Sequence, residues 1–485
     1  MNLSPALCHR DASYLQNGNR AFERGQYADA IQWYEHAIAA DCRLTPILSP
    51  SIRRAETRLR KSGRELPKRR FMLWPAEPPP EERFETIAGG APAIQGAPTV
   101  LVVAHAVGKR LFGAERSLLD MARGAYEGAR CNVVVSLPSR NSDYIKLLAP
   151  FANKILVHEY GPWQQRRSLE SHWVEQFCAV IEKFDIRLVH VNTIMLREPL
   201  VAARACSVPA LVHGREIIGT DTHLQEIIGY DAELITQHIR HLAFRIISNS
   251  SATQRALDPA GYGYVLPNPV DVAAFAQAVQ GRECFQHRAG KALAVGLISS
   301  NLPKKGVEDF LRLALECAAQ GINARFLVIG PRTRYARSLM RRAEFRRLSS
   351  VWFTGYIPDA SAAIARTQVI CNFSNVAESF GRTVLEGMAA GRPAVVYDHG
   401  ALPELVEDHQ TGFVIPFGKP ELAVPILQKL ATDPDYLQQI GENARQRAAR
   451  DFDTAQYGRR TREIYEDALR NWKICADVRE KNWNV

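Results

Sequence analysis

The chain has 485 residues, of which 46% are hydrophobic and 23% charged, with a formal net charge of +10. This length is too great for one hydrophobic core and this composition is that of globular proteins, so a single small domain and a largely disordered chain are both excluded. The positive charge favours anionic partners such as nucleotides or phospholipid surfaces, whereas no stretch resembles a nucleic-acid-binding motif, so we expect no nucleic-acid partner.

The sequence also bears on the compartment in which the protein works. No apolar run approaches the roughly 20 residues that a membrane-spanning helix needs, and Met1–Arg10 has no secretory pattern. The nine cysteines are scattered without a CxxC or Cys/His cluster, so we expect reduced thiols rather than a zinc site or a disulfide framework. We predict a cytoplasmic protein that rests, at most, peripherally on the inner face of the membrane.

Residues 1–70 have the apolar spacing of paired helices. Apolar residues recur every three or four positions in Tyr14–Phe22 and in Tyr27–Ile38, with Arg24-Gly25-Gln26 as the turn between them. The segment resembles one tetratricopeptide unit, with small or aromatic residues where two helices pack closely: Gly18, Ala21, Tyr27, Ala30, Tyr34 and Ala37. An ordinary helical hairpin is the alternative. Because one unit cannot bury its faces alone, we expect it to dock on the rest of the chain, on another subunit or on a protein partner.

A linker and two series of strands follow. Residues 71–97 are rich in proline and contain Gly89-Gly90, which predicts a linker. Short apolar runs of buried-strand type then alternate with helical patterns. The first series comprises Val100–Ala104, Asn132–Ser136, Lys154–His158, Arg187–Val191, Ala210–His213 and Arg245–Ser248. The second comprises Ala292–Gly296, Arg325–Gly330, Val351–Phe353, Val369–Phe373, Ala394–Tyr397 and Gly412–Ile415.

This rhythm predicts an α/β fold with two tandem doubly wound, Rossmann-like domains after a small all-α segment. We place the first domain at residues 98–270 and the second at residues 271–455. The prolines of Leu266–Asp271 fix the backbone at the joint. We expect residues 456–485 to be a helix that crosses back to the first domain, followed by a tail.

The most informative stretch is Asn375–Pro393, between two predicted strands. Glu378 falls in the loop after a strand, where ligands of parallel sheets bind. Phe380-Gly381 opens a helix whose free N–H groups suit a phosphate. Glu378 can accept hydrogen bonds from sugar hydroxyls, and Glu386, two turns into the helix, from the two ribose hydroxyls.

This stretch resembles the signature of the retaining glycosyltransferases of family four, which have the GT-B fold. That signature is E-x-F-G-x-x-x-x-E-x-M-A-x-G-x-P, and the matching residues here are Glu378, Phe380, Gly381, Glu386, Met388, Ala389, Gly391 and Pro393. His399–Glu404 and Gly412-Phe413 match further family positions. The resemblance covers about Pro98 to Phe452 and excludes the N-terminal helices.

The resemblance implies a set of site residues. Glu378, His213 and Lys305 would be catalytic: His213 would contact the transferred sugar, and Lys305 would neutralise the leaving diphosphate. A structural role is the alternative for a lone histidine such as His213. The donor would be bound by Gly113, Lys305, Tyr356, Ile357, Glu378, Ser379, Phe380, Gly381, Arg382 and Glu386.

Two positions depart from the family pattern. Phe112 replaces the first of two glycines in the first domain's phosphate loop, and Leu297 stands where many relatives have an arginine. Either Lys304 or a residue such as Arg382 would then supply the second positive charge beside Lys305, or the site is weaker than in most relatives.

The implied activity is a metal-independent, retaining hexosyl transfer, as in polysaccharide biosynthesis, from a UDP- or GDP-linked sugar to a glycan, lipid-linked or small-molecule acceptor. No cofactor beyond this co-substrate is expected. A catalytically inactive GT-B scaffold whose helical segment binds a protein partner is the alternative. The Glu378–Gly381 segment fits a sugar-nucleotide epimerase or a phosphorylase with the same two-domain architecture less well. The arginine-rich segment 332–347 is either the solvated face of a helix or a contact with anionic lipid.

Overall fold

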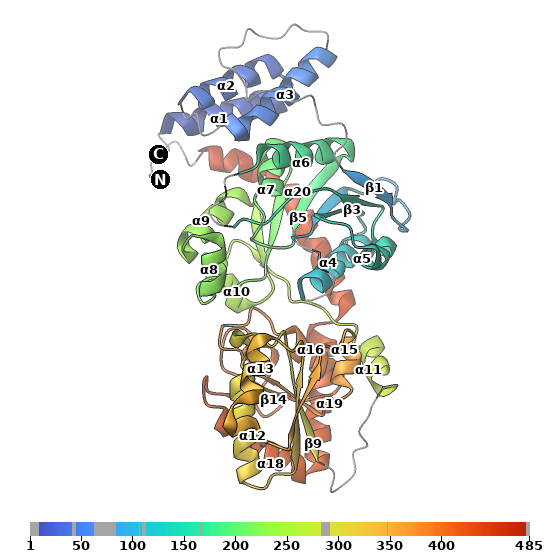
Figure 1. Ribbon diagram of the computed structural model, residues 1–485. Coiled ribbons are helices and arrows are strands. Elements are labelled where there is room, and N and C mark those ends of the chain that lie inside the picture. The colour runs from blue at the N-terminus through green and yellow to red at the C-terminus, as the bar shows by residue number, and fades with distance from the viewer. Residues whose placement is uncertain are drawn as a thin grey trace.

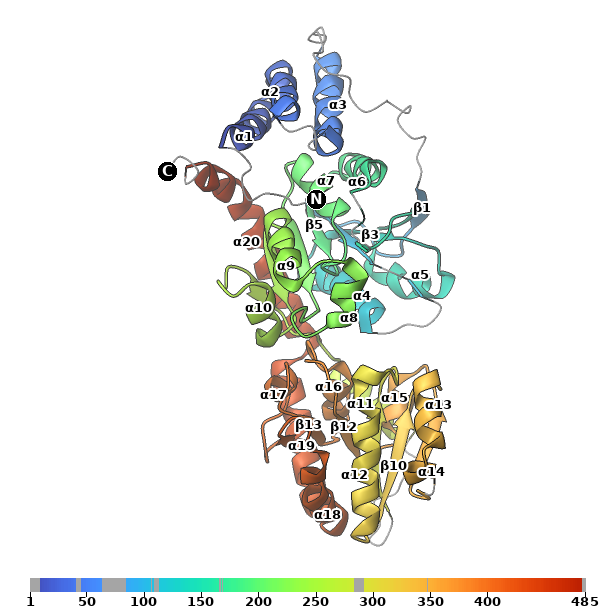
Figure 2. The same cartoon turned by 60° about the vertical axis from the view of Figure 1, so that its left-hand side comes forward.

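The computed structural model describes residues 9–40, 45–62, 84–105, 107–108, 113–164, 167, 169–282, 292–346 and 348–481. Three parts follow one another along the long axis: an N-terminal group of helices and two α/β domains (Figures 1 and 2). Phe112 lies outside the described residues. Among the described helices, none is both long and apolar enough to cross a membrane.

The N-terminal helices form a small core of their own. They are α1 (His9–Glu23), α2 (Tyr27–Ala40) and α3 (Thr45–Lys61). Ala30, Ala37 and Ile52 are fully buried between them. Gly18 on α1 lets the ring of Tyr34 approach closely, because a Cβ at this position would lie 2.5 Å from a carbon of that ring. The sequence predicted this close pairing of α1 with α2; the tetratricopeptide assignment itself stays a prediction.

The first α/β domain is built on an eight-stranded sheet with the order β1-β4-β3-β2-β5-β6-β7-β8. The strands are β1 (Glu85–Ala88), β2 (Thr99–Val103), β3 (Asn132–Leu137), β4 (Lys154–Val157), β5 (Ile186–Val191), β6 (Ala210–Gly214), β7 (Arg245–Ser248) and β8 (Tyr264–Val265). The helices are α4 (Gly113–Arg123), α5 (Ser142–Leu148), α6 (Ser171–Lys183), α7 (Glu198–Ala205), α8 (Thr222–Ile228), α9 (Ala232–Leu242) and α10 (Ser251–Leu257), with short helices η2 (Gly124–Gly128) and η3 (Ala149–Phe151).

Strand β1 corrects one sequence-based prediction. It lies within residues 71–97, which we predicted to be a linker, yet it pairs antiparallel with β4 from Glu85 against Val157 to Ala88 against Lys154. The other seven strands of this sheet are parallel. The sequence pattern does not predict β1, because β1 is an edge strand with mostly exposed residues and lacks the apolar run of a buried strand.

The second α/β domain has a six-stranded parallel sheet in the order β11-β10-β9-β12-β13-β14. Its strands are β9 (Leu293–Ile298), β10 (Ala324–Ile329), β11 (Val351–Gly355), β12 (Val369–Asn372), β13 (Ala394–Tyr397) and β14 (Gly412–Ile415). Its helices are α11 (Val272–Gln280), η4 (Pro303–Lys305), α12 (Val307–Ala319), α13 (Arg334–Arg341), α14 (Ala343–Arg346), α15 (Ala360–Ile364), α16 (Arg382–Ala389), α17 (Leu402–Leu405), η5 (Pro420–Ala423), α18 (Val424–Thr432) and α19 (Pro434–Asp451). The predicted pair of doubly wound sheets is thereby confirmed.

The long helix α20 (Thr454–Lys481) ties the end of the chain back to the first domain, as both views show (Figures 1 and 2). Its Gly458 packs against Gly128 so closely that a Cβ on Gly128 would lie 2.2 Å from the Gly458 Cα. Tyr465 reaches the sheet, where its hydroxyl lies 2.8 Å from Nδ1 of His190 on β5. At the joint, the Val270 N–H donates to the Phe452 carbonyl at 2.8 Å.

Candidate functional site

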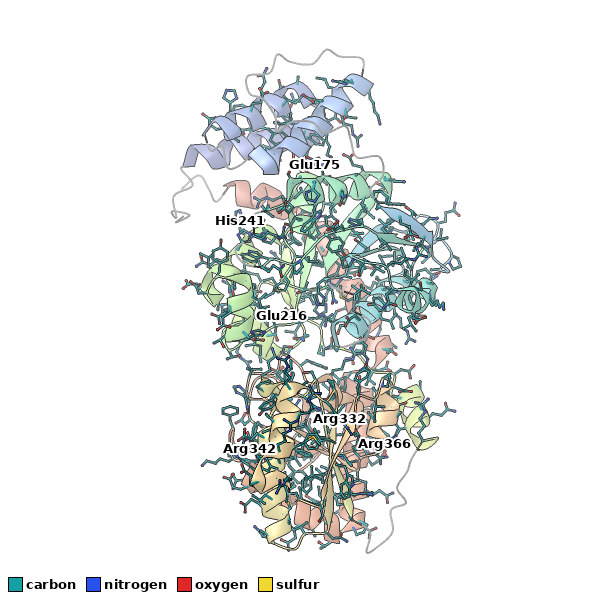
Figure 3. All side chains as sticks on the ribbon, viewed as in Figure 1. Glu175, Glu216, His241, Arg332, Arg342 and Arg366 are labelled. Atoms are coloured by element: carbon teal, nitrogen blue, oxygen red, sulfur yellow. The ribbon has the colours of Figure 1, made fainter. Side chains whose placement is uncertain are left out.

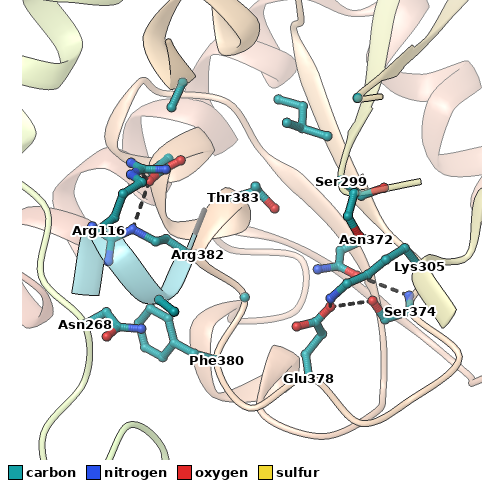
Figure 4. A pocket seen from close by; sticks show the side chains of 18 of the residues that line it. Arg116, Asn268, Ser299, Lys305, Asn372, Ser374, Glu378, Phe380, Arg382 and Thr383 are labelled. Atoms are coloured by element: carbon teal, nitrogen blue, oxygen red, sulfur yellow. Dashed lines mark hydrogen bonds and ion pairs between the residues drawn. The ribbon is translucent and has the colours of Figure 1, made fainter. Parts of the chain in front are cut away.

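A cavity of about 490 Å³ lies between the two α/β domains. Its walls come from the carboxyl ends of strands in both sheets, such as His105 after β2, Asn192 after β5, and Ser299 after β9. Loops at these ends of a parallel sheet converge, which is why open α/β folds bind ligands there. Figure 4 shows the part of the wall in which residues of the second domain predominate.

Glycine shapes the wall at the start of α16. Gly381 has φ +101°, a conformation that costs other residues energy. A Cβ here would also lie 2.8 Å from a side-chain carbon of Leu402. Gly381 therefore turns the chain into α16 with the first residues of the helix, Arg382 and Thr383, on the cavity wall. Backbone N–H groups at such a helix start favour negative charge.

Lys305 and Glu378 meet on the same wall, as drawn in Figure 4. Nζ of Lys305 donates to Oε1 of Glu378 at 2.6 Å, and the Ser374 hydroxyl donates to the same oxygen at 2.5 Å. Gly306, with φ +67°, allows this approach, because a Cβ on it would overlap the Phe373 carbonyl oxygen. Burial alone would raise the pKa of Glu378, but Lys305, Ser374 and Lys304 outweigh it and lower that pKa. The carboxyl group is thus an anion held beside a cation.

Glu386 lies within a second cluster of charges that joins the domains. Its Oε1 forms ion pairs with Arg116 of α4 and, at 3.2 Å, with Arg382. Arg382 also bonds Asp120 of α4 at 2.7 Å. The other oxygen of Glu386, Oε2, is buried and has no hydrogen-bond partner among the described residues. An unpartnered carboxylate oxygen at a cavity wall is suited to accept a ligand hydroxyl.

Further contacts close the gap between the domains. Lys304 bonds Asp221 at 2.8 Å, and the Asn249 amide donates to the Ser379 hydroxyl at 3.3 Å. Glu404 of the second domain accepts two backbone N–H groups at the start of α10. Lys304 does not line the cavity, whereas Arg382 does. Of the two residues expected to supply a second positive charge, the structure therefore places Arg382 at the site.

All ten residues predicted to bind the donor line the cavity: Gly113, Lys305, Tyr356, Ile357, Glu378, Ser379, Phe380, Gly381, Arg382 and Glu386. Ile357 packs with Ile298 and Ile329, and all three residues line an apolar part of the wall. An apolar wall of this kind suits the flat face of a base or an apolar group.

His213, the remaining predicted site residue, does not line the cavity. Strand β6 continues through Gly214, so His213 lies inside the strand, and its ring is fully buried against one face of the sheet and stacked on His190 with ring centroids 5.5 Å apart. Burial, with Arg215 and His190 nearby, lowers the pKa of His213 well below its usual value. We expected the strand to end at His213; since it ends one residue later, Arg215 is the first residue after it, and Arg215 lines the cavity.

Among the polar residues of the wall that were not predicted from the sequence are His105, Asn192, Arg215 and Glu216. Each follows a predicted strand by one to three positions, and this shared position was the available signal. Glu216, labelled in Figure 3, accepts hydrogen bonds from the Thr193 hydroxyl at 3.0 Å and from the Arg215 backbone N–H at 2.9 Å. Burial raises its pKa despite these bonds. Burial likewise lowers the pKa of His105, which favours its neutral form.

The polar part of the wall consists of cations, carboxylates, amides and hydroxyl groups. Among the residues that the structure describes, no group of three or more His, Cys, Asp or Glu side chains is placed to hold a metal ion. Lys305, Arg382 and the α16 start can attract a polyanion such as a diphosphate, while Glu378 and Glu386 can accept hydroxyl groups. This combination suits a phosphorylated sugar compound.

Comparison with known proteins agrees with this chemistry. Residues 285–447 match the family "Glycosyl transferases group 1". Over 113 residues, 23% of this chain, the sequence is 34% identical to the D-inositol 3-phosphate glycosyltransferase of Corynebacterium kroppenstedtii. The chain spans about a quarter of that relative's length (25%). The N-acetyl-alpha-D-glucosaminyl L-malate synthase of Bacillus anthracis is 22% identical over 331 residues, which cover 66% of this chain and 84% of that relative.

A solved structure is similar over both domains. Anabaena Alr3699/HepE in complex with UDP-glucose matches with a TM-score of 0.61 and 20% identity, over 76% of this chain and 99% of the other. The likeness agrees with the predicted GT-B fold. Together with the family match, it identifies residues 285–447 as a group 1 glycosyltransferase domain in a two-domain GT-B architecture.

Proposed function

We propose, from the premise that residues 285–447 form a group 1 glycosyltransferase domain, that the chain transfers a sugar from a nucleotide-diphosphate sugar to an acceptor in the cleft. The observation that carries the proposal is the Lys305–Glu378 pair beside the Gly381 helix start, on the wall of a cavity shared by both domains. The donor diphosphate would lie against Lys305 and the α16 start, and Glu378 and Glu386 would accept hydroxyl groups of the sugar and the ribose.

The proposed chemistry needs little more than these groups. Departure of the diphosphate places negative charge on its oxygens, and Lys305, Arg382 and backbone N–H groups that are already in position stabilise that charge. A single preorganised donor of this kind typically lowers the barrier by about 3 kcal/mol. We propose that transfer retains the anomeric configuration and requires no metal, as the resemblance to family four implies. His213 has no contact role in this proposal.

UDP is the first nucleotide to test, because the similar Anabaena protein holds UDP-glucose. GDP is the second. The acceptor would be a glycan, a lipid-linked glycan or a small molecule. Contact of segment 332–347 with a membrane stays a prediction. In this segment, Arg342 forms ion pairs with Glu308 and Glu344. The side chains of Arg334, Arg337 and Arg341 are exposed on the second domain.

The test is isothermal calorimetry of the purified chain with UDP, GDP, ADP and their glucose conjugates. We expect one nucleotide to bind selectively, and Glu386→Ala to weaken its binding at least tenfold, because the ribose loses its acceptor. Glu316→Ala, an exposed residue of the same domain, is the matched control and should bind like the wild type. A folded wild type that binds none of the nucleotides would contradict the proposed donor site.

Retention and metal independence need a separate measurement. Once a donor and an acceptor are known, proton NMR of the first product formed reports its anomeric configuration. We expect the configuration of the donor to be kept and the rate to be unchanged by EDTA. An inverted product or an EDTA-sensitive rate would contradict this part of the proposal.

A further inference from the structure

Arg215 is held rigidly on the first domain's side of the cavity. It follows β6 directly and lines the cavity wall. Its Nε donates to Oδ1 of Asn192 at 2.7 Å, and its Nη1 donates to Oδ1 of Asn268 at 2.6 Å. Asn192 is fixed in turn, because its amide donates to the Ala114 carbonyl at 2.9 Å. Two neutral amide oxygens thus set the plane of the guanidinium group.

The third nitrogen of this group has no anionic acceptor. Nη2 of Arg215 is buried and forms no hydrogen bond of normal geometry among the described residues. The side chain of Tyr457 on α20 lies close to the guanidinium group, but burial raises the pKa of its hydroxyl, which is therefore neutral. The other three cationic side chains of the wall differ in this respect. Lys305 is bonded to Glu378, Arg116 to Glu386, and Arg382 to both Asp120 and Glu386. Within the described part of the chain, Arg215 forms no ion pair with a carboxylate.

The nearest carboxylates are already engaged. Asp120 and Glu216 attract the Arg215 charge at a distance, but Asp120 bonds Arg382, and Glu216 accepts from Thr193 and from the backbone of Arg215. Burial lowers the pKa of Arg215 to about 10, so the group still carries its charge at neutral pH. A buried cation without an anionic partner is unfavourable, and an incoming anion would relieve that cost.

From this geometry we propose that Arg215 binds an anionic oxygen of a ligand in the cleft, held in place by Asn192 and Asn268. This inference rests on the proposed function. The anion would be either the donor diphosphate or a phosphate or carboxylate group of the acceptor. Guanidinium groups suit both, because their N–H groups form strong, directional bonds to either kind of oxygen. In either case the first domain, and not only the second, would contribute a cation to the site.

The experiment compares Arg215→Met with the wild type by calorimetry, with Arg215→Lys as a second variant that keeps the charge. Arg240→Met is the matched control, since Arg240 lies in the same domain, outside the cavity, and bonds the Leu257 carbonyl. Thermal unfolding verifies that each variant folds. The probes are UDP and GDP, and then inorganic phosphate and acetate titrated into the nucleotide-saturated protein.

A loss of UDP or GDP affinity of about 10- to 100-fold in Arg215→Met, partly restored in Arg215→Lys, would assign the anion to the donor diphosphate. Unchanged nucleotide affinity with a similar loss of phosphate or acetate affinity would assign it to the acceptor. If every probe binds Arg215→Met as it binds the wild type, the inference is overturned. A wild type that binds no nucleotide contradicts the proposed function. In that case inorganic pyrophosphate is titrated into the wild type and into Arg215→Met. Equal binding to the two proteins, or no binding to either, overturns the inference about Arg215.

Discussion

Nζ of Lys305 lies 2.6 Å from Oε1 of Glu378, although 73 positions separate the two residues. The lysine follows the first strand of the second domain, and the glutamate follows the fourth. The sheet order places these strands, β9 and β12, side by side, so their carboxyl ends meet at one edge. Without a ligand, each charge neutralises the other. A donor would have to replace this ion pair with bonds from Lys305 to phosphate and from Glu378 to sugar hydroxyls.

The first prediction follows from that exchange. Glu378→Gln removes the carboxylate that competes for Lys305, so we expect UDP, which lacks a sugar, to bind as tightly as to the wild type or more tightly. Transfer from the UDP-sugar should fall by about 100-fold or more, because the charged acceptor of the sugar hydroxyls is lost. Calorimetry and a transfer or donor-hydrolysis assay measure the two effects. Lys305→Ala is the counterpart, with UDP affinity expected to fall about 10- to 100-fold. Weaker UDP binding in Glu378→Gln would contradict the idea that the donor replaces the Lys305–Glu378 ion pair.

The second prediction concerns the contact between α4 and α16. Arg382 bonds Asp120 across the cleft at 2.7 Å, and both side chains are mostly buried. Asp120→Asn removes the charge partner, so we expect the equilibrium between closed and open domains to shift by about tenfold toward the open form. Small-angle X-ray scattering should show a larger radius of gyration without ligand. Asp143→Asn, at an exposed position of the same domain, should scatter like the wild type. An unchanged radius in Asp120→Asn would show that this ion pair does not hold the cleft.

The two sheets could be predicted because their central strands are apolar on both faces. Val100–Val103 is fully buried, and a run of this kind leaves few alternatives to a parallel strand. Strand β1 could not be predicted, since Glu85–Ala88 is an edge strand with mostly exposed residues, and only its pairing with β4 defines it. Local sequence carries no information about a partner about 70 residues away.

The candidate site divides in the same way. In the second domain, Glu378, Gly381 and Glu386 lie in one continuous motif, and Lys305 stands directly before a glycine. The structure places all four of these residues on the cavity wall. On the first domain, His105, Asn192 and Arg215 are single polar residues after separate strands. No local pattern connects them, and the fold alone brings them together. His213 shows the precision that is needed: β6 ends at Gly214 and not at His213, the ring of His213 packs against His190 on one face of the sheet, and Arg215 lies at the cavity.

The third prediction is a pH dependence of stability that involves His158. This ring is buried between Ser136 and Gln176, and burial lowers its pKa to about 4. In the unfolded chain its pKa is near 6.5. Between pH 6.5 and 4 the unfolded state therefore binds more protons, so the free energy of unfolding falls as the pH falls through this window. The full loss from this residue is on the order of 3 kcal/mol.

Urea unfolding at pH 7.5 and pH 5.0 tests this difference. His158→Gln can keep a hydrogen bond to Ser136 and cannot titrate, so we expect the stability difference between the two pH values to be smaller by about 2 kcal/mol than in the wild type. His223→Gln, at an exposed position on α8, should keep the wild-type difference. Equal pH dependence in wild type and His158→Gln would mean that the folded protein accepts the proton at His158 without loss.

The fourth prediction concerns how the N-terminal helices are attached. Arg54 on α3 forms an ion pair with Glu182 of α6, and its Nη1 donates to the Ala205 carbonyl at the end of α7 at 2.6 Å. The guanidinium group also lies 5.4 Å from the centre of the Phe22 ring on α1. The Arg54 side chain thus links α3 to α6 and α7 of the first domain and to α1 of the helical segment. Arg54→Ala removes these bonds and leaves a partly buried carbonyl without its donor, which costs about 1 to 3 kcal/mol.

We therefore expect the helical segment to detach and open more often in Arg54→Ala, by a factor of about 10 to 100. Limited chymotrypsin digestion should cleave the segment faster by a similar factor, because Phe22, Tyr27 and Tyr34 become accessible, while the α/β domains stay intact. Arg58→Ala, on an exposed turn of the same helix, is the matched control and should be cleaved at the wild-type rate. Equal cleavage of Arg54→Ala and Arg58→Ala would place the attachment in the other contacts of α3 with α6 and α7 rather than in this arginine.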